Sequence, residues 1–326
     1  MTSAPPAVES APPEPGPEDT VGRLLRRHAQ GADHAMAAHA RSFSFASALL
    51  SRGERRAVED IYAFCRATDD LVDESPGGAR PDALLDAWED AARASFHGSP
   101  SGLGVVDRAM RRASADDVPW SWITALFEGM RMDLRGASYA TIDDVQRYAH
   151  RVAGVVGLWL ARAHGVERPE DLSRADALGR AMQLTNIVRD VGEDLRRGRL
   201  YLPRRAMAAH RITLAGLLGA MGGGTIPSGY PSLLEMLMQA AERDYRAGLE
   251  GLPALPPGFG RAVAVAAGVY RGIHREVRRN GYDNLTRRGA TSLPTKVVIA
   301  GRMLLRTAGT FGVSRRAAAP RALPHR

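Results

Sequence analysis

The sequence predicts a single all-α domain, and three observations support this fold class. Apolar residues recur at spacings of three and four, the pattern of one helix face. No segment shows the alternating, β-branched pattern that is typical of strands. The composition does not change along residues 21–310, and no fixed-period repeat divides them, which indicates one domain.

Clusters of glycine and proline separate the expected helices. A helix that contains the apolar residues 61–65 should end at Ser-Pro-Gly-Gly, 75–78, and the next should end at Gly-Ser-Pro, 98–100. Three longer helices follow before the triple glycine at 222–224, and the proline-rich residues 253–258 separate the next two. The expected helices lie near 54–74, 82–96, 119–136, 142–164, 172–197, 231–250, 259–281 and 294–307.

Both ends of the chain lack this periodicity. Residues 1–20 are rich in Pro, Ala, Glu and Ser and are expected to be disordered. Residues 311–326 should form a flexible basic tail that can touch anionic lipid. No apolar segment approaches the roughly 20 residues of a membrane span, and no secretory signal precedes the helices. We therefore expect a cytoplasmic protein with at most peripheral contact at the inner face of the membrane.

The composition limits the classes of partner. The chain has 326 residues and a net charge of +8, and Lys296 is the only lysine among 44 basic residues. The arginines are scattered and no zinc-finger spacing or RNA-binding signature occurs, so we expect no nucleic-acid partner. Diphosphates or a phospholipid surface suit the charge better. Cys65 is the only cysteine, which excludes an intrachain disulfide and indicates an inert core thiol.

Two acidic clusters are the most informative part of the sequence. Residues four apart share a helix face, so Asp69 aligns with Asp73, and Asn186 aligns with Asp190 and Asp194. Acidic helix faces are often simply solvated. Here each cluster follows apolar sequence, where carboxylates are costly unless they are paired or bind metal. Mg²⁺ takes one or two carboxylates and completes its shell with phosphate oxygens, so the clusters predict a diphosphate site.

Basic and apolar residues around the clusters suit the ionisation of an allylic diphosphate. Metal ions and guanidinium groups would neutralise the departing diphosphate, and an apolar cavity would protect the carbocation from water. The small residues 152–157 would either line that cavity or pack tightly against another helix. Candidate side chains for the cation are Phe43, Tyr62 and Tyr148. Candidate cations for the diphosphate are Arg66, Arg189, Arg196, Arg197, Arg199, Arg288 and Lys296.

The quoted segments resemble the phytoene and squalene synthase family of head-to-head trans-isoprenoid synthases. Four segments carry the resemblance, which spans about residues 34–305. Within the family, the chain is most similar to bacterial phytoene synthases. The most specific is Asn186-Ile-Val-Arg-Asp-Val-Gly-Glu-Asp194, followed by Arg197-Gly-Arg-Leu-Tyr-Leu-Pro203. The others are His39–Phe43, Ala63–Asp73 and Tyr148–Gly157.

The resemblance implies the all-α isoprenoid synthase fold, with both aspartate motifs facing a central cavity that binds two prenyl diphosphates through Mg²⁺, or alternatively Mn²⁺. It assigns metal ligation to Asp69, Asp70, Asp73, Asn186, Asp190 and Asp194. It assigns catalysis to Asp69, Asp73, Asp190, Asp194 and Tyr148. It assigns substrate binding to Ser42, Phe43, Arg66, Gln183, Asn186, Arg189, Tyr201 and Arg288.

For the product, the resemblance favours 15-cis or all-trans phytoene, formed from two geranylgeranyl diphosphates through a cyclopropyl (prephytoene) diphosphate. Such an enzyme of carotenoid biosynthesis needs no NADPH, and downstream carotenoid enzymes would be its partners. Residues 283–292 resemble the phytoene synthase ending but depart from it at Gly289-Ala290-Thr291. The alternatives are a squalene, presqualene diphosphate or dehydrosqualene synthase that uses farnesyl diphosphate, and, from another class, a non-catalytic membrane-associated homologue. A terpene cyclase is disfavoured by the Arg-Gly-Arg-Leu-Tyr-Leu-Pro segment.

Overall fold

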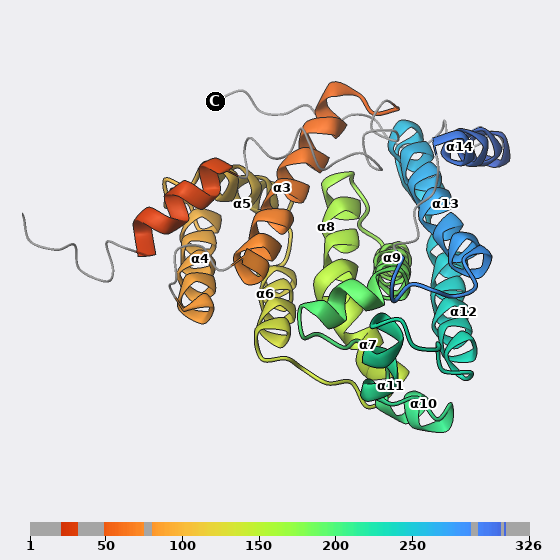
Figure 1. Cartoon of the computed structure of the whole chain (residues 1–326). Helices are drawn as coiled ribbons and strands as arrows, with labels where there is room; N and C mark the ends of the chain where they lie inside the picture. Colours follow the sequence, from red (N-terminus) through yellow and green to blue (C-terminus); the bar gives the residue numbers. More distant parts are fainter. Residues whose placement is uncertain (1–20, 32–48, 75–79, 288–292, 308–309, 311–326) are drawn as a thin grey trace, which may run out of the picture.

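The computed structural model describes residues 21–31, 49–74, 80–287, 293–307 and 310. Within these residues the chain is helical and contains no strand, which confirms the predicted all-α class (Figure 1). The predicted tails, 1–20 and 311–326, lie outside the described residues, as do the candidate site residues Ser42, Phe43 and Arg288. Those predictions therefore stay untested.

The helices follow one another with short connections (Figure 1). A helix at 21–31 comes first among the described residues. It is followed by α3 (Arg52–Glu74), α4 (Pro81–Phe96), α5 (Gly104–Ala115), α6 (Trp120–Leu134), α7 (Ile142–Ala149), the π-helix η2 (His150–Gly154), α8 (Val155–Ala163), α9 (Pro169–Arg196), α10 (Arg204–Ala209), α11 (Leu214–Met221), α12 (Tyr230–Leu249), the 3₁₀-helix η3 (Leu252–Ala254), α13 (Pro257–Arg279) and α14 (Leu293–Thr307).

Helix α9 is the central element of the domain. Figure 1 shows it nearly end-on, with α8 on one side and α12 and α13 on the other. It also packs on η2 and α7. The apolar residues of α9 are not confined to one face, because neighbouring helices cover it from several sides. Its buried residues, from Ala177 to Leu195, point in more than one direction. A helix in this position can present one face to a cavity while its other faces are fixed by packing.

Two clusters of buried residues fix the helices on either side of α9. On the α3 side, Phe64 packs edge-on against Phe127 and Trp159 and stacks on Trp88, and all four side chains are buried. The Trp88 indole nitrogen donates to the Thr68 hydroxyl at 3.0 Å, so this buried polar group is paired. On the other side, α9, α12 and α13 share a second cluster that includes Tyr230, Leu234 and Ile273.

The predicted helix boundaries agree with the structure to within a few residues. One predicted helix differs in type, because it is not a continuous α-helix. The segment expected as one helix near 142–164 is α7, η2 and α8, because a π-helical stretch interrupts it. The prediction omitted the helix at 21–31, α5, α10 and α11. Helices α10 and α11 have only 6 and 8 residues, too short for a clear helical period.

Glycines allow η2 and α8 to approach α9 closely. A Cβ atom on Gly157 would lie 2.4 Å from the Ala175 carbonyl oxygen, and one on Gly179 would lie 2.3 Å from the Ala153 carbonyl oxygen. Both contacts are far below van der Waals distance and involve backbone, which cannot move aside easily. Gly157 therefore serves helix packing, and it also lines the cavity together with Val152, Ala153 and Val156, so both interpretations of this segment hold.

We predict that Gly179→Ala destabilises the protein by about 1–3 kcal/mol, because the added methyl group forces α9 away from η2. Chemical denaturation monitored by circular dichroism would measure the change. The matched control is Gly219→Ala in α11, where nothing lies within 4 Å of the added Cβ atom. This variant should be neutral or slightly stabilised, as expected for alanine in a helix. Equal stability of the two variants would contradict the close-packing argument.

Candidate active site

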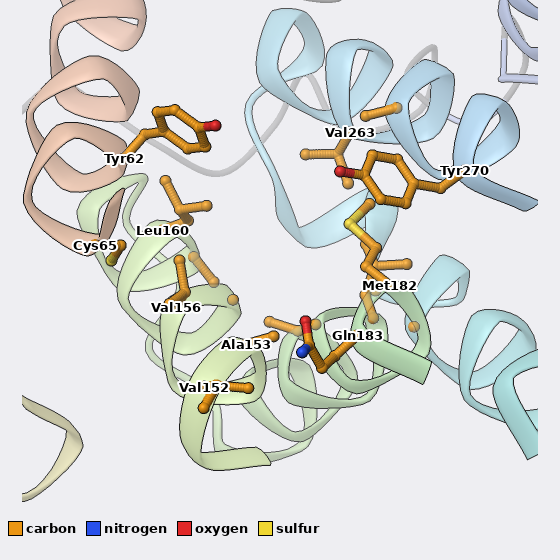
Figure 2. A pocket seen from close by; sticks show the side chains of 18 of the residues that line it. Tyr62, Cys65, Val152, Ala153, Val156, Leu160, Met182, Gln183, Val263 and Tyr270 are labelled. Carbon is orange, nitrogen blue, oxygen red and sulfur yellow. The ribbon is translucent and has the colours of Figure 1, made fainter. Parts of the chain in front are cut away.

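A cavity of about 480 Å³ lies between α3, α8, α9 and α13 (Figure 2). Helix α3 contributes Tyr62 and Cys65, α8 contributes Val156 and Leu160, and Met182 comes from α9, as Figure 2 shows. Most of the wall is apolar, which suits a hydrocarbon chain. The Tyr62 and Tyr270 hydroxyls point towards each other across the opening between α3 and α13.

Six residues predicted for the site line this cavity. They come from three separate segments of the chain, α3, α7 and α9, so the fold brings them together as the motif interpretation requires. They are Arg66, Asp69, Tyr148, Gln183, Asn186 and Arg189. The remaining predicted residues, Asp70, Asp73, Asp190, Asp194 and Tyr201, adjoin them in sequence or through side-chain contacts but do not themselves line the cavity.

The first aspartate motif lies at the end of α3 and is paired with arginines. Arg66 contacts Asp69 at 3.2 Å and Asp70 at 2.5 Å, as their spacing on one helix predicts. Burial and the neighbouring Asp73 raise the pKa of Asp69 to about 6. Asp73 points towards the end of α9 and is almost fully buried, and its carboxylate pairs with Arg199 at 2.5 Å.

Arg197 also pairs with Asp73, so two guanidinium groups from the segment after α9 hold the end of α3. Both arginines are among the predicted cations for the diphosphate, and in the sequence they directly follow the second motif. Arg197 does pair with Glu193 of that motif, at 3.2 Å, and both arginines in addition join the second motif to the first through Asp73. A buried carboxylate needs such partners, because desolvation of an unpaired charge is costly.

The second aspartate motif begins inside α9 and includes a distortion of the helix. Asp190 has φ −107° and ψ 15°, outside the helical range, and α9 is kinked there. The Arg189 Nε atom donates to Asp190 at 2.7 Å, instead of the Arg189–Glu193 pair that helix spacing alone would allow. Burial and the charge of Asp190 raise the pKa of Asp194 to about 8.

Asn186 has the clearest unfilled binding capacity in the site. Its side-chain nitrogen donates to Gln183 at 3.2 Å, which turns its carbonyl oxygen away from that residue. This oxygen is buried and has no hydrogen-bond partner. Because buried polar atoms are almost always paired, an unpaired carbonyl oxygen among carboxylates indicates a site for an external cation or donor.

The donor set fits a hard divalent cation. All side-chain donors in the two motifs are oxygen atoms, the type that Mg²⁺ and Mn²⁺ prefer. In the described part of the chain, no three acidic, histidine or cysteine side chains already converge at metal-binding distance. The pairing of Asp70, Asp73 and Asp190 with arginines accounts for this arrangement, since each carboxylate is directed at guanidinium groups and not at another carboxylate.

Asp133, which sequence reasoning missed, is central to a tyrosine cluster beside the cavity. The Tyr148 hydroxyl donates to one of its carboxylate oxygens at 2.8 Å, and the Tyr201 hydroxyl donates to the other at 2.7 Å. The two tyrosine rings stack with their centroids 4.9 Å apart. Burial raises the pKa of Asp133, although both hydroxyls act against that shift. A single aspartate within an amphipathic helix carries no local signal of such a role.

A buried polar cluster fixes α9 from behind the second motif. The Thr185 hydroxyl lies 3.0 Å from the Tyr245 hydroxyl on α12 and 2.9 Å from the His274 Nε2 atom on α13. Burial lowers the pKa of His274 to about 4, so this imidazole is neutral at physiological pH. Since Asn186 is the next residue after Thr185, the cluster sets the position of the second motif.

Cys65 and the remaining arginine candidate differ from their expected surroundings. The Cys65 side chain lines the cavity instead of the closed core, and burial raises the pKa of its thiol to about 12. The thiol is therefore unreactive at neutral pH, as predicted. Arg196 donates to the Leu285 carbonyl oxygen and not to a carboxylate of the motifs. Tyr270 on α13, which also lines the cavity, was not singled out from the sequence.

Comparison with known proteins identifies the family. A family model described as squalene/phytoene synthase matches residues 36–295. The 15-cis-phytoene synthase of Paracoccus sp. (strain N81106 / MBIC 01143) is 38% identical over 80% of this chain and 85% of its own. The phytoene synthase of Thermus thermophilus is also 38% identical, over 77% of this chain and 83% of its own. The chain belongs to the squalene/phytoene synthase family.

Solved structures confirm the fold of this family. The crystal structure of a dehydrosqualene synthase in complex with ligand matches with a TM-score of 0.75 at 28% identity, covering 89% of this chain and 99% of that chain. The squalene synthase HpnC from Alicyclobacillus acidocaldarius matches with a TM-score of 0.67 at 26% identity, covering 79% and 95%. The predicted isoprenoid synthase fold is therefore confirmed.

We predict that Asp194→Asn stabilises the metal-free protein at alkaline pH. The pKa of Asp194 rises from 3.8 to about 8 on folding, so its contribution to stability is lost as the pH rises through about 8. Above that pH the folded wild type holds a buried charge that the amide lacks. The variant should be at least about 1 kcal/mol more stable there, and the difference should shrink as the pH falls.

Thermal unfolding in a chelating buffer over a pH series would measure this difference. The matched control is Asp144→Asn, because the Thr141 backbone and hydroxyl hydrogen bonds lower the pKa of Asp144. This control should lose stability under the same conditions. A destabilised Asp194→Asn at alkaline pH would show that the carboxylate is well solvated or paired instead.

Proposed function

We propose that this protein is a phytoene synthase, which condenses two geranylgeranyl diphosphates head to head and releases both diphosphates. The observation that carries the proposal is the juxtaposition of the two aspartate motifs and their arginines with one apolar cavity. The relatives that are 38% identical are named phytoene synthases, which supports this product. The enzyme is accordingly a prenyltransferase of the family identified above.

The two motifs would hold the diphosphates at the polar end of the cavity. We propose that Asp69, Asp70, Asp73, Asn186, Asp190 and Asp194 hold Mg²⁺, which supplies charge neutralisation of the leaving diphosphate when bound. Arg66 and Arg189 line the cavity and can donate to the same diphosphate oxygens. Without diphosphate, Arg66 pairs with Asp70 and Arg189 pairs with Asp190, and these pairs hold the guanidinium groups in position. When diphosphate binds, both arginines would exchange the carboxylates for its oxygen atoms.

The apolar part of the cavity would protect the cationic intermediates. Val156, Leu160 and Val263 face the cavity with apolar side chains, which would not trap a carbocation (Figure 2). The Tyr62 and Tyr270 rings come from helices on opposite sides and offer π-faces or hydroxyl dipoles near the reacting carbons. Gln183, beside Asn186 and the motifs, would orient the diphosphate through its amide group.

A squalene, presqualene diphosphate or dehydrosqualene synthase is the second candidate, because the solved structures of similar fold carry such names. The two candidates differ in the length of the prenyl chain and, for squalene, in the need for NADPH. The observation that favours phytoene is the higher identity to phytoene synthases, 38% against 28% for the dehydrosqualene synthase structure.

Product analysis tests the proposal. Purified protein is incubated with Mg²⁺ and either geranylgeranyl or farnesyl diphosphate, each with and without NADPH. We expect a hydrocarbon of twice the chain length from geranylgeranyl diphosphate without NADPH. Product from farnesyl diphosphate alone would move the protein to the second candidate, and no product from either substrate would favour a non-catalytic homologue.

Within the same assay, Asp190→Asn should reduce turnover by about 100-fold or more, because it removes a charge from the diphosphate site. Its melting temperature should stay close to that of the wild type. The matched control is Asp86→Asn, which changes an exposed carboxylate that pairs with Arg131 on the surface. Near-normal turnover of Asp190→Asn would contradict the metal assignment.

We also propose peripheral membrane contact through α14. Among the described residues, no helix has the length and apolar character needed to cross a bilayer. Helix α14 packs on α13, and its outer side exposes Val297, Val298 and Leu305 together with Arg302. Apolar side chains beside a cation suit the surface of a membrane that contains anionic lipid, where long hydrocarbon substrates and products also reside.

We predict that Val298→Ser combined with Leu305→Ser lowers binding to vesicles that contain phosphatidylglycerol by about tenfold, because less apolar surface enters the bilayer. Flotation of the full chain with vesicles would measure the bound fraction. The matched control is Leu218→Ser, which changes an apolar residue of α11 that is 48% exposed, close to the 53% of Val298. Equal loss in both variants, or none, would contradict a docking role for α14.

A further inference from the structure

The kink in α9 disturbs the regular hydrogen bonding of the helix inside the second aspartate motif. Asp190 leaves the helical range of backbone angles, with φ −107° and ψ 15°. In a regular helix the Gly192 N–H group would donate to the Val188 carbonyl oxygen, four residues before it. Val188 and Gly192 are both buried, so backbone groups released by the kink need partners within the protein.

One residue of the turn that follows α13, Asn284, supplies a partner to each of these two groups. The Gly192 N–H group donates to the Asn284 backbone carbonyl oxygen at 3.1 Å. The Asn284 side-chain nitrogen donates to the Val188 carbonyl oxygen. Asn284 thus bridges the kink, as an acceptor through its main chain and as a donor through its side chain. It lies 96 positions after Val188, and sequence analysis assigned it no role.

The Asn284 side chain is itself held in this orientation. The Tyr230 hydroxyl, at the start of α12, donates to the Asn284 side-chain oxygen at 2.5 Å, which leaves the amide nitrogen directed at α9. Asn284 is 4% exposed and Tyr230 is fully buried, so water does not replace these bonds. An amide has one oxygen acceptor and one nitrogen donor, and can therefore bind Tyr230 and Val188 at the same time.

The backbone of the same turn lies directly against α9. A Cβ atom on Gly192 would lie 2.1 Å from the Leu285 carbonyl oxygen, so only glycine allows this approach. The Leu285 carbonyl oxygen also accepts a hydrogen bond from Arg196 at 3.3 Å. Two adjacent residues of the turn therefore fix α9 at three points that are four residues apart, on both sides of Asp190.

We infer that Asn284 is a positioning residue of the second aspartate motif, because it holds the kink that sets where Asp190 and Asp194 lie. The inference rests on the proposed function, in which both carboxylates help to bind the metal and diphosphate. Residues four apart stack on one face of a regular helix, and the kink changes this alignment between Asn186 and Asp194. Asn284 therefore acts on the site through the backbone of α9.

The ion pair at the kink supports this coupling. The Arg189 Nε atom donates to Asp190 at 2.7 Å, although neighbouring side chains on a regular helix point about 100° apart. At the kink the two side chains meet, so the direction of the Asp190 carboxylate depends on the local backbone. The bonds from Asn284 to Val188 and Gly192 enclose that part of the backbone.

Metal binding by Asn284→Leu tests the inference in the full-length protein. This change is close in size and removes the amide that bridges the kink. Mn²⁺ binding in the presence of inorganic diphosphate would be measured by electron paramagnetic resonance of the free ion. We expect the Mn²⁺ affinity to fall about 10- to 100-fold, the usual effect of losing an outer-shell partner of a metal site.

Gly192→Ala perturbs the same contact from the other side. Its added methyl group would push the Leu285 carbonyl group, and with it Asn284, away from α9. The variant should lose Mn²⁺ affinity in the same range. Combining it with Asn284→Leu should cause little further loss, because both changes break one contact.

The matched control is Asp107→Asn, which weakens a buried turn before α5 instead. Asp107 is 7% exposed and accepts hydrogen bonds from the backbone N–H groups of Ser101 and Gly102. Every residue of α5 is described, and none of them lines the large cavity. Asp107→Asn should therefore lower the melting temperature and leave the Mn²⁺ affinity unchanged, which separates loss of stability from displacement of the motif.

Hydrogen exchange followed by mass spectrometry provides a readout that needs no metal. In the wild type the Gly192 N–H group is protected by its bond to Asn284. Peptides of α9 that contain Gly192 should exchange faster in Asn284→Leu, because the kink opens locally. Peptides around Ala177, in the first half of α9, should exchange as in the wild type.

Two results would overturn the inference. One is a Mn²⁺ affinity of Asn284→Leu close to that of the wild type, and the other is an equal loss in Asp107→Asn. If Asn284→Leu does not fold, Tyr230→Phe decides, since it removes the hydroxyl that orients the amide and should weaken Mn²⁺ binding in the same direction. Failure of the proposed function would appear differently, as no product from geranylgeranyl diphosphate with the wild type, while Mn²⁺ binding is compared independently of product.

Discussion

Carboxylates buried at the end of an apolar cavity impose the constraint on which the rest of the site depends. Asp69 and Asp194 have raised pKa values because the fold removes them from water and places them near other carboxylates. An arrangement of this kind is stable only when cations are close. Arginines from α3, from α9 and from the segment after α9 supply them in the ligand-free state, where Arg199 and Arg197 join α3 to α9 through Asp73.

Packing in the rest of the fold fixes the positions of these charged side chains relative to one another. Helix α9 carries one motif, forms a wall of the cavity and packs on helices at both sides, so a shift of α9 would change all three. Glycine contacts hold η2 against it at backbone distance, and Thr185 ties it to α12 and α13 through buried hydrogen bonds. The buried carboxylates cost folding free energy but are needed for diphosphate binding, so stability and activity conflict mainly there. The apolar packing around them supports both.

The sequence predicted the fold class, most helices and a set of site residues that the cavity brings together. Same-face spacing worked for Arg66 and Asp69, since α3 is continuous there. It was less accurate in α9, because the kink at Asp190 breaks the regular stacking of the second motif. Asp133 and Tyr270 were missed for a different reason. Their importance arises from contacts between helices far apart in the chain, for which periodicity carries no signal.

The π-helix η2 shows how one extra residue can serve two neighbours at once. A π-turn holds one residue more than an α-turn, so the helix that follows is rotated by about 100° relative to an uninterrupted one. Tyr148 lies before η2 and meets Asp133 on α6, while Gly157 lies after it and meets the backbone of α9. The extra residue thus lets the part before η2 face α6 and the part after it face α9. A regular α-helix of the same length would turn one of these two contacts away from its partner.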